Sequence, residues 1–230
     1  MSIFNILFPS RCVVCREFTD SEKVFCPICA SKYEQMKRKL CSVCGKPHTE
    51  CRCRATALRE TAFPVSQRHL FAFDGDVART VIYKLKRKNL TGLQRFLAEE
   101  LSRLIREEKR RGEAYIILYP PRSAKGVMTY GFDQAKILAY EAGRILGMPV
   151  FDAFIRENSV EQKTLSSGER AKNAFCSYVI KEKTDLSGLA VIIIDDVVTS
   201  GSTASRLCSL AFSAGAKRAV VVSVAKGVFC

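Results

Sequence analysis

The amino-acid sequence predicts a doubly wound α/β domain with a mostly parallel sheet, preceded by a small cysteine-rich module. Residues 190–194 contain a continuous β-branched run, which is typical of a strand buried on both faces. A helical pattern at residues 202–214 stops at Gly215, and a second buried run follows at residues 218–224. A buried strand, a helix and another buried strand in this order indicate parallel strands joined by crossover helices.

Elements of the same kind precede this region. Strand, helix, strand and helix patterns occur in turn at residues 69–73, 93–105, 115–119 and 137–147. A polar stretch at residues 156–172 lacks apolar periodicity and is predicted to contain a long loop. Because strands and helices alternate through most of the chain, the predicted fold class is α/β.

Cysteines are concentrated near the N-terminus, where eight of the eleven occur before residue 54. They form three Cys-x2-Cys pairs and one Cys-x-Cys pair, and two such pairs supply the four soft ligands of a tetrahedral Zn²⁺ ion. The simplest grouping is sequential, with Cys12, Cys15, Cys26 and Cys29 in one site and Cys41, Cys44, Cys51 and Cys53 in the other. His48 is an alternative ligand for the second site. Since the protein would fill all four positions, we expect structural zinc rather than catalytic zinc.

The change in composition predicts a boundary between a zinc-binding module at residues 1–56 and an α/β domain at residues 57–230. We expect zinc removal to unfold the module first, because its metal ligands replace a hydrophobic core. The module carries ten basic and five acidic residues, so its charge is compatible with DNA binding.

The chain carries a formal net charge of +14, and much of the basic excess is local. Between Arg79 and Arg111 there are eleven basic residues and four acidic ones. This stretch suits a phosphate-bearing ligand or nucleic acid, and a solvated helix face is the alternative explanation. No apolar run approaches the roughly 20 residues of a membrane-spanning helix, and the N-terminus lacks the basic start and cleavage site of a signal peptide. We therefore expect a cytoplasmic protein.

The most informative segment runs from a buried strand through Asp195 and Asp196 into a turn of small residues. At the carboxyl end of a parallel strand, such a turn opens into the crevice where α/β proteins bind ligands. Amides at the start of the next helix favour an anion there, and the two carboxylates can accept hydrogen bonds from vicinal hydroxyls or hold a hydrated Mg²⁺ ion. The segment therefore predicts a sugar-phosphate site. Its turn residues are Thr199, Ser200, Gly201, Ser202 and Thr203.

Residues 195–203 and the strand before them resemble the motif that binds 5-phosphoribosyl-1-diphosphate (PRPP) in type I phosphoribosyltransferases. The resemblance implies the fold of that family, with Asp195 and Asp196 binding the ribose hydroxyls. It also implies that the small residues from Thr199 to Thr203 bind the 5-phosphate, and that Mg²⁺ accompanies PRPP. Neither Gly-Lys-Ser/Thr nor G-x-G-x-x-G occurs here, which excludes a nucleotide P-loop and a dinucleotide loop.

Over nearly its full length the chain resembles the ComF family of phosphoribosyltransferase-like proteins, which is associated with bacterial competence and DNA uptake. The resemblance rests on the cysteine-rich module and on residues 83–86, 130–134 and 162–175. In the last of these segments, the family's Gln, Arg and Asn are matched by Gln162, Arg170 and Asn173.

One segment departs from the family pattern. Where the family has Arg-Gly-Phe-Asn-Gln, Tyr130 and Asp133 replace the Arg and the Asn. The loss of the arginine puts a phosphate contact from this position in doubt, and Arg122 and Lys125 are nearby candidates to supply it.

The same resemblance implies that pyrophosphate is displaced from PRPP. Lys84 and Lys86 are the candidates that bind the diphosphate, and Asp195, Asp196 and Lys84 are the candidate catalytic residues. Some purine-salvage relatives have an Asp where this chain has Thr199. A threonine cannot act as a base near neutral pH, so purine salvage of that type is disfavoured.

Residues 156–172 are a candidate lid that closes over the site and excludes water. Unchanged hydrogen exchange in this stretch on adding PRPP and Mg²⁺ would argue against that role.

Three interpretations of function remain open. The first is an active phosphoribosyltransferase that acts on a nucleobase or nucleic acid. The second is a PRPP-binding module without turnover, with single-stranded DNA, a competence helicase or other DNA-processing proteins as partners. The third is a zinc-containing nucleic-acid-binding protein whose α/β domain is a scaffold. Pyrophosphate release that needs a specific acceptor distinguishes the first from the second, and DNA binding without PRPP affinity favours the third.

Overall fold

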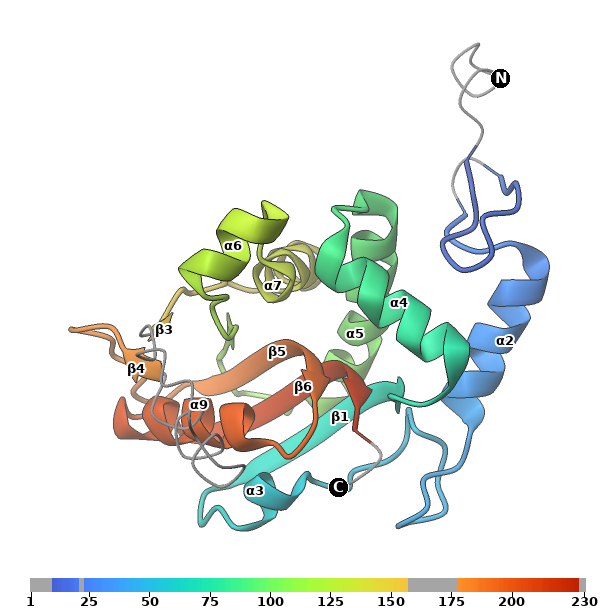
Figure 1. Ribbon diagram of the computed structural model, residues 1–230. Coiled ribbons are helices and arrows are strands. Elements are labelled where there is room, and N and C mark those ends of the chain that lie inside the picture. The colour runs from blue at the N-terminus through green and yellow to red at the C-terminus, as the bar shows by residue number, and fades with distance from the viewer. Residues whose placement is uncertain (1–9, 21–22, 157–177, 228–230) are drawn as a thin grey trace, which may run out of the picture.

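The computed structural model describes residues 10–20, 23–156 and 178–227, with a four-stranded sheet at its centre (Figure 1). The strands lie in the order β1-β6-β5-β2, and every neighbouring pair is parallel. Their bounds are Val65–Ala72 for β1, Tyr115–Leu118 for β2, Ala190–Val198 for β5 and Arg218–Lys226 for β6. This arrangement confirms the predicted α/β class with a parallel sheet.

Helices cover both faces of the sheet, as its buried strands require. Every residue of β6 is buried and β5 is buried along most of its length, so neither strand has a face open to water. One face packs against α4 (Gly75–Arg87), α5 (Thr91–Glu108) and α7 (Gln134–Leu146). The other face packs against α9 (Ser202–Ser213), with α3 (Thr56–Arg59) beside it (Figure 1).

Side chains along β5 alternate between these two layers, as the geometry of a strand dictates. Ile192 and Ile194 belong to the core that contains α5 and α7, whereas Val191 and Ile193 belong to the core that contains α9.

Several elements were not predicted, among them three short ones that follow β2. Helix α6 (Ala124–Tyr130) follows β2, and β3 (Phe154–Arg156) pairs antiparallel with β4 (Tyr178–Ile180). Each is too short to show a clear period in the sequence. The predicted long loop after Arg156 lies outside the described residues. No helix in the described ranges is long and apolar enough to cross a bilayer.

Strand β1 starts at Val65, four residues before the predicted start. Gln67, Arg68 and His69 are all buried in it, with at most 1% of each exposed. Polar side chains at buried positions conceal the apolar pattern by which a strand is predicted.

The N-terminal module packs against the sheet edge formed by β1, through α2 (Pro27–Arg38) (Figure 1). Tyr33 of α2 is buried and packs against the rings of Phe71 and Phe96, with centroids 5.9 and 5.4 Å apart. Lys37 of α2 forms a buried ion pair with Glu100 of α5. The module and the α/β domain therefore share a hydrophobic core.

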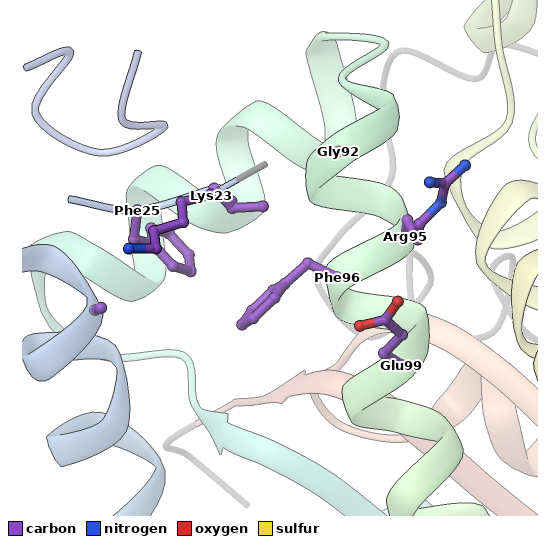
Figure 2. A pocket seen from close by; sticks show the side chains of 8 residues that line it. Lys23, Phe25, Gly92, Arg95, Phe96 and Glu99 are labelled. Atoms are coloured by element: carbon purple, nitrogen blue, oxygen red, sulfur yellow. The ribbon is translucent and has the colours of Figure 1, made fainter. Parts of the chain in front are cut away.

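A pocket of about 690 Å³ lies between the module and α5 (Figure 2). Phe25 and Phe96 meet edge to face at one side of it, with ring centroids 5.4 Å apart. Lys23, Arg95 and Glu99 also line the pocket. It shares no lining residue with the acidic segment of β5, so it is separate from the predicted site.

Candidate functional site

The two acidic residues of the predicted site lie near the carboxyl end of β5, in the interior of the sheet. Asp195 is in register with Ser223 of β6, and β5 continues past Asp196 to Val198. The prediction that the strand ends at the acids is therefore wrong. The strand runs further because its last two residues pair in turn with Ala225 and Lys226.

Asp196 is almost fully buried, with 4% of its surface exposed, and its carboxylate has partners from two helices. Gln134, at the start of α7, donates from Nε2 to Oδ2 at 2.7 Å. Lys86, in the last turn of α4, places Nζ 3.5 Å from Oδ1. A buried carboxylate needs partners of this kind, and together they fix its orientation. Oε1 of Gln134 is buried and has no partner among the described residues, so it can accept a hydrogen bond from a ligand or a water.

Asp195 is less deeply buried than Asp196. Its Oδ1 accepts the backbone N–H of Asp196 at 2.7 Å. Burial, followed by the negative charge of Asp196, raises the pKa of Asp195 to about 8. Burial and, to a smaller extent, the charge of Asp195 also raise the pKa of Tyr178 in β4. An acid with so high a pKa is set to lose its proton when a cation binds.

After β5 the chain turns through Thr199, Ser200 and Gly201 into α9, and the first two of these residues are exposed. Gly201 has a φ of +83°, which L side chains rarely adopt, and it forms the N-cap of α9. The backbone N–H groups of Gly201 and Thr203 have no hydrogen-bond partner in the described part of the chain. Oγ of Ser200 lies 3.0 Å from Oγ of Ser202. Unpaired amides at the start of a 12-residue helix, beside hydroxyl groups, can bind an anion.

The structure brings Lys86, but not Lys84, to the acid pair. Residues two positions apart on a helix point about 200° apart, so the two lysines cannot face one ligand together. Lys84 forms no ion pair with any described residue.

Arg122 connects neighbouring elements instead of pointing into open space. Its guanidinium donates to the carbonyl oxygens of Phe132 and Lys86 at 3.0 and 3.1 Å, and it lies 4.3 Å from the ring centroid of Tyr130. Its backbone N–H donates to Asp133, which also caps α7. Tyr130 and Asp133 therefore hold Arg122 in place.

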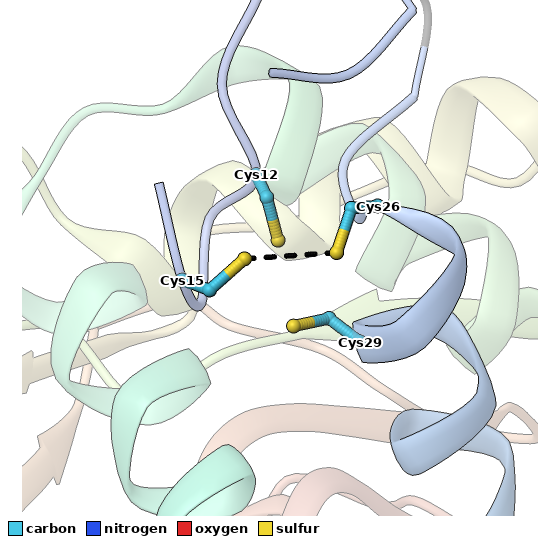
Figure 3. Close-up of side chains that lie close together, drawn as sticks. All are labelled: Cys12, Cys15, Cys26 and Cys29. Atoms are coloured by element: carbon cyan, nitrogen blue, oxygen red, sulfur yellow. Dashed lines mark hydrogen bonds between the residues drawn. The ribbon is translucent and has the colours of Figure 1, made fainter. Parts of the chain in front are cut away.

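The eight N-terminal cysteines form two clusters, in the sequential grouping that was predicted. Within each cluster the Sγ atoms all lie within 4.8 Å of one another. Figure 3 shows the first cluster, in which Sγ of Cys15 lies 3.6 Å from Sγ of Cys26. In the second cluster the Sγ atoms of Cys44 and Cys51 are 3.7 Å apart. Four Zn–S bonds of about 2.3 Å at tetrahedral angles place the sulfur atoms about 3.8 Å apart, so both clusters fit a zinc ion.

The ionisation of the thiols also fits zinc. Burial raises the pKa of Cys12, but hydrogen bonds from backbone N–H groups outweigh it and lower the value to about 6. The same competition lowers the pKa of Cys41 to about 7. Burial and the neighbouring thiols instead raise the pKa of Cys29 to about 12. A bound cation is therefore needed to bring all four sulfur atoms of a cluster to the thiolate form that ligates zinc.

His48 is not a ligand of the second cluster, which its four cysteines complete. Nδ1 of His48 lies 3.0 Å from Nε2 of His69 in β1, and both side chains are buried. Burial, followed by the charge of His48, lowers the pKa of His69 to about 3. The two histidines form a neutral pair between the module and the sheet, and neither contacts the acid pair in the described part of the chain.

Sequence reasoning missed one residue of the acid site. Gln134 lies in the segment that carried the family resemblance, so a role could have been assigned to it. The residues of segment 162–175 that match the family, Gln162, Arg170 and Asn173, lie outside the described residues.

Comparison with known proteins addresses the two parts of the chain separately. A family model described as the double zinc ribbon domain matches residues 3–59, which include all eight clustered cysteines. No curated protein matches the chain in sequence.

Several solved structures are similar to part of the chain. A hypoxanthine phosphoribosyltransferase from Staphylococcus aureus is 12% identical, with 56% of this chain and 61% of that one covered and a TM-score of 0.37. A hypoxanthine-guanine phosphoribosyltransferase from Bacillus anthracis is 15% identical, with 56% and 66% covered and a TM-score of 0.38. Glutamine PRPP amidotransferase from B. subtilis is 17% identical, with 56% and 25% covered and a TM-score of 0.37. The chain spans less than two thirds of the length of each of these proteins.

Proposed function

We propose that this chain binds PRPP with Mg²⁺ and transfers the phosphoribosyl group to an acceptor, with release of pyrophosphate. The proposal rests mainly on one observation: the acid pair, Asp195 and Asp196, lies next to a candidate anion site, residues 199–203, at the end of β5. Asp195 and Asp196 would accept hydrogen bonds from the ribose hydroxyls, and the amides and hydroxyls of residues 199–203 would bind the 5-phosphate. The motif resemblance in the sequence supports the same assignment.

Magnesium suits this site because carboxylate, phosphate and water oxygens are the ligands that it prefers. The acid pair offers two carboxylates, one of which holds a proton that a cation can displace. A bound Mg²⁺ ion would offset the negative charge of the diphosphate.

In the proposed transfer, the bond between ribose C1 and the diphosphate oxygen breaks, and its electron pair leaves with the diphosphate. The acceptor forms a new bond to C1 and loses a proton to water. Lys86 can support the departing diphosphate, because its ammonium group lies beside the acid pair. Arg122 is less suited to this task, since its guanidinium donates to two backbone carbonyls.

The two lysines of α4 provide a matched test of this placement. We expect Lys86→Ala to weaken PRPP–Mg²⁺ binding by roughly 10-fold, the low end for a hydrogen bond to a charged group, because its side chain is 41% exposed. Lys84→Ala should leave the affinity within about twofold, since Lys84 faces away from the acids. Titration calorimetry measures both. A larger loss in Lys84→Ala than in Lys86→Ala would assign the diphosphate to the other side of α4.

Binding should also release a proton from the acid pair. Because the pKa of Asp195 is raised to about 8, this residue is mainly protonated at pH 7 and must ionise to hold a cation. Affinity should therefore rise with pH and level off above about pH 8. Calorimetry in buffers of different ionisation enthalpy should find about one proton fewer released by Asp195→Asn than by the wild type at pH 7. Equal proton release would show that Asp195 is not the group that titrates.

We also propose that the reaction serves DNA uptake, as the ComF resemblance implies. The test is an acceptor screen that includes nucleobases and single-stranded DNA, with pyrophosphate release from PRPP as the readout. Release that needs one acceptor supports transfer. If PRPP binds but no acceptor leads to pyrophosphate release, the alternative is supported. In that case the chain is a non-catalytic PRPP-sensing module that acts through DNA or protein contacts.

A further inference from the structure

The segment that leaves the second cysteine cluster runs directly to the phosphate loop. We call residues 53–59 the arm: it begins at Cys53, the last ligand of that cluster, and ends with α3. Ala55 and Leu58 of the arm are fully buried, in the same core as α9. The predicted domain boundary after residue 56 would cut through α3, within this arm.

The arm touches the backbone of the phosphate loop, residues 199–203, at two points. The N–H of Ala57 donates to the carbonyl oxygen of Ser200 at 3.0 Å. A Cβ atom on Gly201 would lie 2.8 Å from Cβ of Ala55 and 3.4 Å from Cγ of Leu58. Gly201 is thus required by the approach of the arm as well as by its positive φ.

The other end of the arm is fixed to strands β6 and β1 of the sheet. Nζ of Lys226, the last residue of β6, donates to the carbonyl oxygen of Cys53 at 3.1 Å. The N–H of Ala55 donates to Oε1 of the buried Gln67 in β1 at 2.7 Å. Among the described residues the first cluster has no such connection, because Cys12, Cys26 and Cys29 belong to the core on the opposite face of the sheet.

We propose that zinc in the second cluster holds the phosphate loop in its anion-binding conformation through the arm. Zinc at Cys41, Cys44, Cys51 and Cys53 fixes the start of the arm, and Ala55, Ala57 and Leu58 transmit that position to Ser200 and Gly201. Zinc in the second cluster and an anion on the loop then stabilise each other, because coupling between two sites is reciprocal. The proposal deepens the proposed function and rests on it only for the identity of the anion.

Amide hydrogen exchange of residues 199–205 in the full zinc-loaded chain tests the coupling without any ligand. Cys53→Ser, which weakens the second site, should raise the exchange rate of this segment at least about 5-fold, the lower end of typical coupling. Cys29→Ser, which weakens the first site, should leave it within about twofold. Equal exchange in the two variants would overturn the proposal.

A second pair of variants keeps every zinc ligand and guards against general unfolding. Leu58 and Leu186 are both buried in the α9 core, but Leu186 lies by the C-terminal end of α9, where its N–H donates to Ala214. Both Leu→Ala changes leave a comparable cavity. Faster exchange of residues 199–205 in Leu58→Ala alone supports the arm, and equal acceleration in both contradicts it.

Zinc competition with a chromophoric chelator, with and without ribose 5-phosphate, then tests reciprocity. Saturating ribose 5-phosphate should raise the zinc affinity of the second cluster at least about 5-fold in Leu186→Ala and less than twofold in Leu58→Ala. Ligand binding with no difference between the variants would overturn the coupling. No binding of ribose 5-phosphate to the wild type would instead overturn the proposed function, while the exchange result would still decide the role of the arm.

Discussion

Replacing both Asp195 and Asp196 with Asn should lower the affinity for PRPP–Mg²⁺ by roughly 10²–10⁴-fold. Each carboxylate loses a charged interaction with the ligand, and a hydrogen bond to a charged group contributes about 1.5–3 kcal/mol. The fold should survive, because Asn keeps the shape of Asp and its amide oxygen could still accept the hydrogen bond that Gln134 donates to Asp196. Titration calorimetry of the zinc-loaded double variant measures the loss.

The control for this experiment is Asp185→Asn. Asp185 is an exposed carboxylate that accepts the N–H of Ser187, in a turn before β5. The Asp185→Asn variant should bind PRPP–Mg²⁺ with the affinity of the wild type. A loss of affinity in the double variant is then due to the acid pair. Wild-type affinity in a folded double variant would falsify the role assigned to these carboxylates.

After zinc is removed by a chelator, the whole chain should unfold on heating in one transition, with a thermal midpoint at least about 10 °C lower than that of the zinc-loaded chain. Structural zinc contributes on the order of 10 kcal/mol to folding in isolated zinc fingers, and a loss of about 5 kcal/mol shifts a domain of this size by roughly 10–20 °C. Calorimetry and far-UV circular dichroism follow the transition. The sequence favoured a different outcome, in which the module unfolds first.

The shared core is the reason for the revised expectation. Tyr33 packs between Phe71 and Phe96, so loss of the module exposes rings of β1 and α5. Arg68 of β1 is buried, and its guanidinium donates to the carbonyl oxygen of Thr49 at 2.6 Å and pairs with Glu108 of α5 at 2.9 Å. A melt in two steps, with the α/β part keeping its midpoint, would contradict this account.

The sequence predicted those features that depend on local pattern. Buried β-branched runs identified β5 and β6, and cysteine spacing identified both clusters. The carboxylates and small residues at 195–203 are contiguous in the sequence, and the structure places them together at the end of β5 and the start of α9. Each of these signals spans only a few neighbouring residues, so no knowledge of the folded chain was needed.

The features that the sequence did not predict depend on contacts between distant segments. The phase of α4 decides that Lys86 reaches Asp196 and Lys84 does not, and the start of a helix is poorly fixed by pattern. The imidazole of His48 could ligate zinc, but in the structure it pairs with the ring of His69. The contact between Ala55 and Gly201 joins segments that are far apart in the sequence. A contact between two small residues produces no periodic pattern from which it could be predicted.

The central claim is that the end of β5 and the start of α9 receive a ribose 5-phosphate group. The most direct measurement is a crystal structure of the zinc-loaded chain with PRPP and Mg²⁺. We predict the 5-phosphate against the amides of residues 199–203, with the ribose hydroxyls at Asp195 and Asp196. A PRPP molecule bound elsewhere, for example in the pocket between Phe25 and Phe96, would contradict the account.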